Sequence, residues 1–216
     1  EINLLLIDYE KLETSPWFDN RVQKLSSIAA SMATNFFNKR FRELSRQESE
    51  YLEVECRKNP CLENRTQLTR LSIMHTKSAC KGAEFAACAF NLPREEVTNY
   101  FNWRQQDAIR NSIQMTGQAY FSQSELNEKR NQEIIDMLIQ QKDVDWNKLE
   151  THKQRGTCIT RSAHSSFILN EKRITTDTWS TDYNIPLFIG EGRNYIEKYL
   201  YPDESSHERI KLTNHE

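Results

Sequence analysis

The chain has 216 residues, of which 28% are charged and 37% hydrophobic, and its formal net charge is −2. This balance argues against a nucleic-acid-binding protein of the globally basic kind, although a local basic patch can still form. No apolar run reaches the roughly 18 residues that a membrane span needs, and no signal-peptide pattern is evident. Five cysteines in a chain without a secretory signal are typical of reduced thiols, so we expect a cytoplasmic protein.

The first 41 residues combine a strand pattern with a helix pattern. Glu1–Tyr9 is an almost continuous apolar run bounded by charged residues, which is typical of a strand buried on both faces. Leu12–Pro16 is predicted to be a turn. In Phe18–Phe41 apolar residues recur at spacings of four and three, which predicts an amphipathic helix. Its basic end, Lys39–Arg42, fits either a phosphate contact or a solvated helix end, where cations are favoured.

The segment Arg42–Gly82 is charged and weakly periodic, and we expect a variable insertion that is partly disordered. It carries four residues of types that bind metal ions, Cys56, Cys61, His75 and Cys80. Three thiolates and one imidazole can complete a tetrahedral zinc site. Their spacing is looser than the C-x2-C pairs of common zinc sites, so reduced thiols in an inserted segment are the competing interpretation.

The segment Pro93–Phe121 is predicted to be a long helix. Proline suits the first helical position, because the amide it lacks would have no partner there. Glu95 and Glu96 then place negative charge where the helix dipole favours it. Five apolar residues at helical spacing form the stripe that is predicted to face the core: Val97, Phe101, Ala108, Met115 and Ala119.

Polar side chains interrupt this stripe or lie beside it. Arg104 and Asn111 fall on the stripe, and Asp107 lies next to it on the same flank of the helix. Such groups on a core helix cost desolvation free energy unless they are paired. Two interpretations therefore stay open, a structural hydrogen-bond network and a substrate-binding face.

The other predicted elements are shorter. Glu84–Leu92 alternates in hydropathy and is predicted to be a strand. A break is expected at Gly117–Ser122, and the polar residues from Pro202 onward are expected to fray. The later segments with a predicted structure are a helix over Glu133–Gln141, a strand over Thr157–Thr160 and a helix over Arg193–Leu200.

The run Trp103–Ile113, WRQQDAIRNSI, resembles the central helix of the tRNA-histidine guanylyltransferase superfamily, and in particular its guanylyltransferase-like branch. Smaller segments with the same resemblance include Val144–Asn147, Lys153–Ile159 and Trp179–Tyr201. The resemblance implies a palm like that of polymerases. It also implies the addition of nucleotides in the 3′-to-5′ direction to the 5′ end of tRNA, either in tRNA processing or in 5′-end repair.

The same resemblance implies an α+β fold with a palm-like antiparallel sheet packed by long helices, incomplete at the N-terminus and followed by a helical C-terminal part. We expect residues 1–121 to be the remaining part of the palm-like catalytic domain, with 42–82 as a variable insertion. Residues 122–201 are expected to be the C-terminal part of the same unit, and 202–216 a frayed tail.

Candidate site residues follow from the resemblance as well. Glu1 matches the last residue of an S-D-E triplet in the acidic site of the family. Lys129 and Arg155 are expected to contact RNA or triphosphate. The residues expected to form the nucleotide- or RNA-binding face of the central helix are Arg104, Asp107, Arg110 and Asn111. The expected ligands and partners are two Mg²⁺ ions, GTP or ATP, tRNA, and further copies of the chain in a homotetramer.

The sequence also departs from the family pattern. Ala86 and Cys88 stand where the family commonly has Asp and Arg, Glu128 replaces a glycine, and the principal metal-binding aspartates of the family lie upstream of Glu1. Because two Mg²⁺ ions need several converging carboxylates, we expect an N-terminally truncated, inactive chain. The alternatives are a non-catalytic RNA-binding or oligomerisation remnant of the family and, more weakly, a zinc-dependent interaction module.

Overall fold

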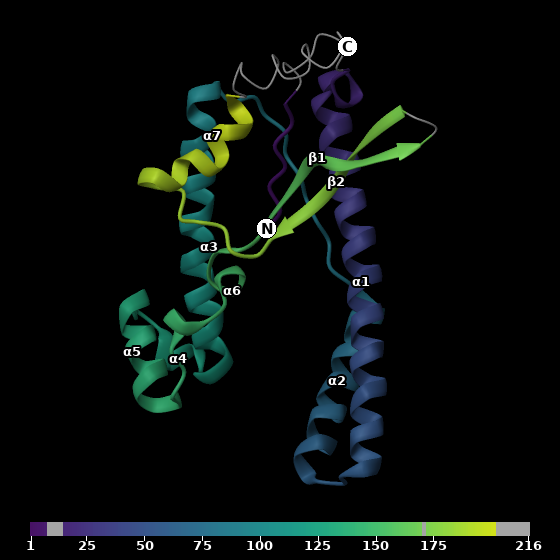
Figure 1. Ribbon diagram of the computed structural model, residues 1–216. Helices are drawn as coiled ribbons and strands as arrows, with labels where there is room; N and C mark the ends of the chain where they lie inside the picture. Colours follow the sequence, from purple (N-terminus) through teal and green to yellow (C-terminus); the bar gives the residue numbers. More distant parts are fainter. Residues whose placement is uncertain (8–14, 170–171, 202–216) are drawn as a thin grey trace. The chain divides into compact units, whose positions relative to one another are not determined.

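The structure is a computed structural model that describes residues 1–7, 15–169 and 172–201 (Figure 1). The described residues form two compact units, which meet between Asn91 and Leu92 in the sequence. Most of them are helical, and their one sheet is a two-stranded antiparallel hairpin. The predicted α+β class is confirmed. Within the described ranges, no helix combines the length and hydropathy that crossing a membrane requires.

The first unit is built on two long antiparallel helices, α1 (Val22–Lys58) and α2 (Leu62–Lys81), which follow the short 3₁₀ helix η1 (Trp17–Asn20). After α2 the chain returns along α1. The Asn38 side chain donates to the carbonyl oxygen of Ala83 at 2.8 Å and accepts from the Ala83 amide at 2.7 Å. Gly82 makes this approach possible, because it has φ +61° and a Cβ there would lie 2.9 Å from Asn38 Oδ1.

The predictions for residues 18–82 need correction, because the helix expected to end at Phe41 continues to Lys58 and the expected insertion is helical throughout most of its length. Neither α1 nor α2 contains glycine or proline, and both are rich in residues with high helix propensity. Ion pairs between residues one turn apart, such as Arg57–Glu53 at 3.6 Å, further stabilise these helices. The apolar periodicity of residues 42–82 is weak because α1 and α2 contact each other along a narrow face, and not because the segment is disordered.

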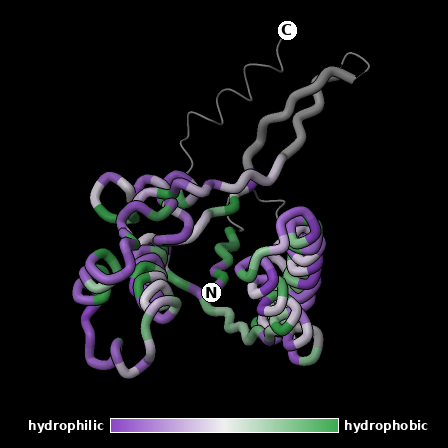
Figure 2. Tube along the Cα trace, turned by 90° about the horizontal axis from the view of Figure 1, so that it is seen from below, coloured by the Kyte–Doolittle hydropathy of each residue, from purple (hydrophilic) through white to green (hydrophobic). Residues whose placement is uncertain are grey.

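The two predicted strands of the first unit are also wrong as far as the structure describes them. Residues 1–7 and 83–92 have no regular secondary structure, and residues 8–9 lie outside the described ranges. Most of the predicted turn at Leu12–Pro16 lies outside them too. Figure 2 shows the apolar character of the N-terminal segment, in which Ile2, Leu4 and Leu6 are exposed. An apolar run has the composition of a strand, but a strand forms only where another backbone supplies the ladder.

The second unit is organised around α3 (Val97–Tyr120), which confirms the predicted long helix. The 3₁₀ helix η2 (Arg94–Glu96) precedes it, and α7 (Asn194–Leu200) and α5 (Asn131–Lys142) confirm the two other helix predictions. The remaining helical segments are α4 (Gln123–Leu126), η3 (Trp146–Lys148), α6 (Thr151–Arg155) and η4 (Gly190–Arg193). The core of this unit consists of Ile113, Phe121, Leu126, Ile134, Ile135, Leu138 and Trp146.

The face of α3 that packs on this core differs from the predicted stripe. Ile113 and Gly117 are buried, whereas Met115 is 69% exposed. At Gly117 a Cβ atom would lie 2.8 Å from Cγ2 of Ile134, so the absence of a side chain lets α5 approach closely. Apart from Val97, the predicted stripe therefore lies outside the buried residues of this helix.

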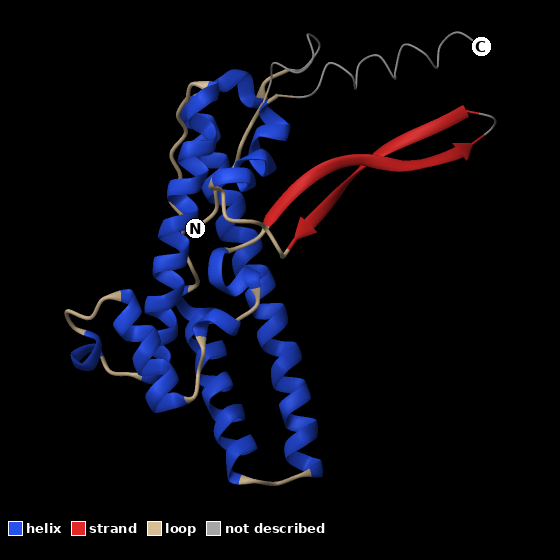
Figure 3. Ribbon diagram, turned by 60° about the vertical axis from the view of Figure 1, so that its left-hand side comes forward, coloured by secondary structure: helices blue, strands red, loops and turns tan. Residues whose placement is uncertain are grey.

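The sheet consists of β1 (Cys158–Leu169) and β2 (Lys172–Asp182), with Cys158 opposite Asp182 and Leu169 opposite Lys172 (Figure 3). The prediction of a strand at Thr157–Thr160 is confirmed for Cys158–Thr160, but the structure extends it by nine residues to Leu169. The pairing is irregular between Ala163 and Ser165. Serine and threonine supply four of the 12 residues of β1 and five of the 11 residues of β2, so the apolar alternation is too weak to reveal the full length of the hairpin.

Candidate functional site

The polar group of α3 is a compact network centred on the carboxylate of Asp107. Nη2 of Arg104 donates to Oδ2 of Asp107 at 2.9 Å, and Nδ2 of Asn111 donates to the same oxygen at 3.4 Å. Arg110 donates to the other carboxylate oxygen, Oδ1. The spacing of three and four residues places these groups on one flank of the helix, as predicted.

The members of the network differ in their exposure to solvent. The side chains of Arg104 and Asp107 are 17% exposed, whereas that of Arg110 is 64% exposed. The guanidinium of Arg104 also lies over the indole ring of Trp103, 4.4 Å from its centroid, which is a favourable cation–π geometry. The carboxylate of Asp107 thus accepts hydrogen bonds from the largely buried Arg104 and from the exposed Arg110.

This arrangement carries one carboxylate and two guanidinium groups, so it is positively charged by one unit. Arginine remains protonated at every relevant pH, and its planar donors match the geometry of phosphate oxygens. Because Arg110 is both exposed and oriented by Asp107, it can present donors to an anionic ligand with little further loss of side-chain entropy. The network is therefore a hydrogen-bonded element of α3 that presents an oriented guanidinium group to solvent.

The opposite flank of α3 fixes the loop that precedes α7 through Gln105. Its Nε2 donates to the carbonyl oxygen of Pro186 at 2.8 Å, and its Oε1 accepts from the amide of Phe188 at 2.8 Å. Gln105 is buried, as are Ile185 and Phe188 in the loop. Sequence reasoning did not identify Gln105, because nothing local distinguishes it from its exposed neighbour Gln106.

Arg155 holds the same loop from another direction. Its Nε donates to the carbonyl oxygen of Ile185 at 2.9 Å. Arg155 ends α6, and Gly156 follows with φ +91°, which favours glycine at this turn. At least one donor of Arg155 therefore has a structural partner within the protein, and its contact with RNA or triphosphate stays a prediction.

The base of the β-hairpin contains a third polar group. Oη of Tyr195 donates to Oδ2 of Asp182 at 2.8 Å. The pKa of Asp182 is lowered by the backbone hydrogen bond from Asn184 and by that from Tyr195. Burial raises the pKa of the Cys158 thiol, and burial together with Asp182 raises that of Tyr195. Burial of Cys158 therefore disfavours its thiolate form, which is the nucleophilic one.

No protein-family model and no curated protein matches the chain, but solved structures do. One is a bacterial tRNA(His) guanylyltransferase (Thg1)-like protein in complex with ATP, which is 32% identical with a TM-score of 0.61 and matches 91% of this chain. Another is such a bacterial protein in complex with GTP, with 29% identity, a TM-score of 0.53 and a match over 90% of this chain. The chain belongs to the tRNA(His) guanylyltransferase-like superfamily. It spans 65% of the first of these proteins and 62% of the second.

Within the second unit of this guanylyltransferase-like chain, Lys129 and Arg155 form no hydrogen bond or ion pair with the Asp107 network as far as the structure describes them. Lys129 is exposed between α4 and α5, and its amide donates to the Leu126 carbonyl oxygen at 3.1 Å. Glu128 has φ +61°, so it occupies a conformation that favours the glycine for which it substitutes. Glu1 lies in the first unit, where Asn3 donates to its Oε1 at 3.0 Å.

In the guanylyltransferase-like chain, the structure does not bring the four candidate zinc ligands into one group. The candidate ligands are distributed along two helices, since Cys56 lies near the end of α1 while His75 and Cys80 lie in the later part of α2. At about 1.5 Å per residue, the helix separates Leu62, next to Cys61, from Cys80 by about 27 Å. In the described part of the chain, no three side chains of His, Cys, Asp or Glu gather into a group that could hold a metal ion.

Proposed function

We propose that this chain binds a nucleoside triphosphate and the 5′ end of a tRNA, as part of a nucleotidyltransferase that adds nucleotides in the 3′-to-5′ direction. The observation that carries the proposal is the similarity, over nine-tenths of the chain, to two guanylyltransferase-like proteins that were solved with ATP and with GTP. Sequence identity of about 30% over that length supports a shared binding function as well as a shared fold. The resemblance further supports a homotetrameric, cytoplasmic protein.

The Asp107 network supports this proposal by its charge and its order. A triphosphate carries several negative charges on oxygens that accept hydrogen bonds, and arginine recognises such groups better than lysine does. In this proposal Arg110 contacts the phosphates. Arg104 and Asn111 act through Asp107 and position it. Lys129 and Arg155 are the further cationic contacts that the family resemblance implies.

A test of the nucleotide-binding part compares three variants in calorimetric titrations with ATP. We expect Arg110→Gln to weaken ATP binding about tenfold, because it removes a charged hydrogen bond to phosphate. Asp107→Asn makes the site one unit more positive but releases Arg110, so we expect it to weaken binding too.

Lys148→Gln is the control. It removes one exposed positive charge of the same unit, far along the chain from α3, and should leave ATP affinity within about twofold. Stronger ATP binding by Asp107→Asn would show that Asp107 does not orient the site.

The described residues do not fit the two-metal site that the family resemblance implies. They contain no group of three or more potential ligands, and Glu1 is the one residue that matches the acidic triplet of the family. We therefore derive no metal-dependent step from these residues. The second candidate function is a non-catalytic nucleotide- or RNA-binding part of the family that also takes part in oligomerisation.

A nucleotide-addition assay separates the two candidates. The chain of 216 residues is incubated with 5′-truncated tRNA, Mg²⁺ and either GTP or ATP, and the RNA is resolved at single-nucleotide resolution. We expect no extended product, because the described residues contain no group of three or more potential ligands that could hold two Mg²⁺ ions. Extension that depends on Mg²⁺ would show that the chain supplies its own carboxylates and is an active enzyme.

A further inference from the structure

The two long helices of the first unit enclose a shallow pocket that the proposed nucleotide site does not use. Its volume is about 570 Å³, and six residues line it: Asn35, Lys39, Arg42, Glu43, Arg46 and His75. All six are polar or charged. Five of them come from α1 and His75 comes from α2, so the pocket lies within one unit. We call it the hairpin pocket.

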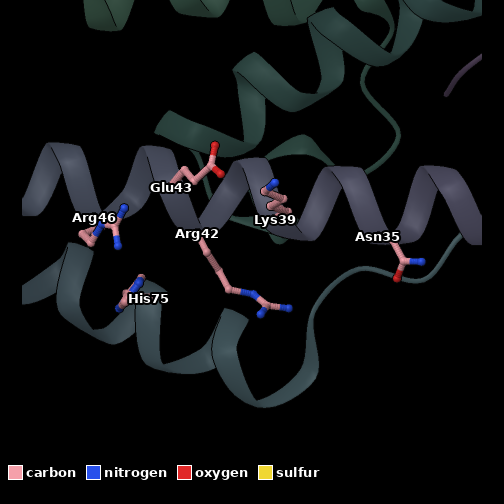
Figure 4. Close-up of a pocket in the computed structure, with 6 residues that line it drawn as sticks. All are labelled: Asn35, Lys39, Arg42, Glu43, Arg46 and His75. Carbon is pink, nitrogen blue, oxygen red and sulfur yellow. The ribbon is translucent and has the colours of Figure 1, made fainter.

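The cations of the hairpin pocket form a row along α1. Residues 35, 39, 42 and 46 follow one another at spacings of four, three and four, which places them on one face of a helix. Lys39 and Arg46 are therefore separated by about 10 Å along the axis. In Figure 4, Arg42 extends from α1 toward α2, and the imidazole of His75 points from α2 toward α1.

The positive charge of this row is poorly neutralised. Within the ranges that the structure describes, no carboxylate forms an ion pair with Lys39 or Arg42, and Arg46 reaches Glu50 only at 4.0 Å on the exposed surface. The remaining acid of the pocket, Glu43, is paired with Arg40 at 3.4 Å. Like charges three and four residues apart destabilise a helix, so the row has a cost for folding that an anionic ligand would offset.

We propose that the hairpin pocket binds backbone phosphates of an RNA strand. The inference rests on the proposed function, in which RNA is the substrate. Exposed lysine and arginine residues along a surface contact successive phosphates without reading the bases. A free nucleotide fits less well, because the pocket lining has no apolar side chain against which a base could pack and its cations form a row rather than a converging set.

The binding experiment uses the full chain and a fluorescently labelled tRNA, whose anisotropy is measured over a range of salt concentrations. The test variant is Arg42→Gln/Arg46→Gln. The matched control is Arg65→Gln/Arg70→Gln, which removes the same charge from exposed positions of α2 that do not line the pocket. We expect the test variant to bind tRNA about five- to thirtyfold more weakly, and the control within about twofold of the wild type. The dependence of log K on log salt should become shallower by roughly one to two units in the test variant alone.

Several results would overturn the inference. Equal effects of the two double variants would show that the pocket has no special part in RNA binding, and so would an unchanged affinity of the test variant. A loss of ATP binding in Arg42→Gln/Arg46→Gln, with tRNA binding intact, would identify a nucleotide site instead. A wild-type chain that does not bind tRNA would refute both this inference and the RNA-binding part of the proposed function. The Arg110→Gln titration with ATP tests the nucleotide-binding part separately.

Discussion

Replacement of Gln105 by alanine is expected to lower the free energy of unfolding by about 2–4 kcal/mol. The substitution removes both hydrogen bonds to the loop before α7 and leaves the buried amide of Phe188 and the carbonyl oxygen of Pro186 without their partner. Each buried backbone group that loses its hydrogen bond costs about 1–3 kcal/mol. Urea-induced unfolding, followed by tryptophan fluorescence, measures the change.

The neighbouring residue supplies the control for this experiment. Gln106 is exposed, and its amide donates to the side chain of Asn102 on the helix surface at 3.3 Å. Gln106→Ala therefore removes the same number of atoms from the same helix but should change stability by less than about 0.5 kcal/mol. If both variants unfold at the same urea concentration as the wild type, Gln105 does not hold the loop.

Leu138→Ala is expected to destabilise the second unit by about 2–5 kcal/mol. Leu138 is fully buried in the core that α3, α4 and α5 share, where truncation removes apolar contacts and leaves a cavity. Trp146 belongs to the same core, so its fluorescence reports the loss of packing as well as unfolding.

Ile139 is the matched control for this substitution. It follows Leu138 on the same helix and is exposed, so truncation to alanine removes little buried area and should cost less than about 1 kcal/mol. Equal destabilisation by Leu138→Ala and Ile139→Ala would mean that α5 does not pack on α3 through Leu138.

The candidate site illustrates what local sequence can predict. The Asp107 network joins residues within one helix, so the helical repeat alone places Arg104, Arg110 and Asn111 around the carboxylate. Likewise, the long helix at 97–120 follows from its composition, although Glu95 and Glu96, expected in its first turn, lie just before it in η2. By contrast, Gln105 and Arg155 bind backbone atoms 30 to 83 residues away, and no local pattern marks those partners.

The errors in the predicted fold have the same origin. The apolar segments at 1–7 and 83–92 have the composition of strands but pair with no other described segment, because the ladder of a strand depends on a second backbone. The core-facing stripe of α3 was misplaced because its position is set by where α4 and α5 pack, and Gly117 marks that contact by lacking a side chain.

By itself, the sequence determined the family resemblance, the α+β class and the approximate positions of α3, α5 and α7, because these depend on motifs and periodicities within a few turns of chain. The tertiary structure decided which face of α3 is buried, that Gln105 and Arg155 hold the loop before α7, and that residues 42–81 form parts of two helices facing each other across a basic pocket. Those features depend on contacts between segments that are distant in the chain. The free energies of such contacts are not encoded in any local pattern of residues.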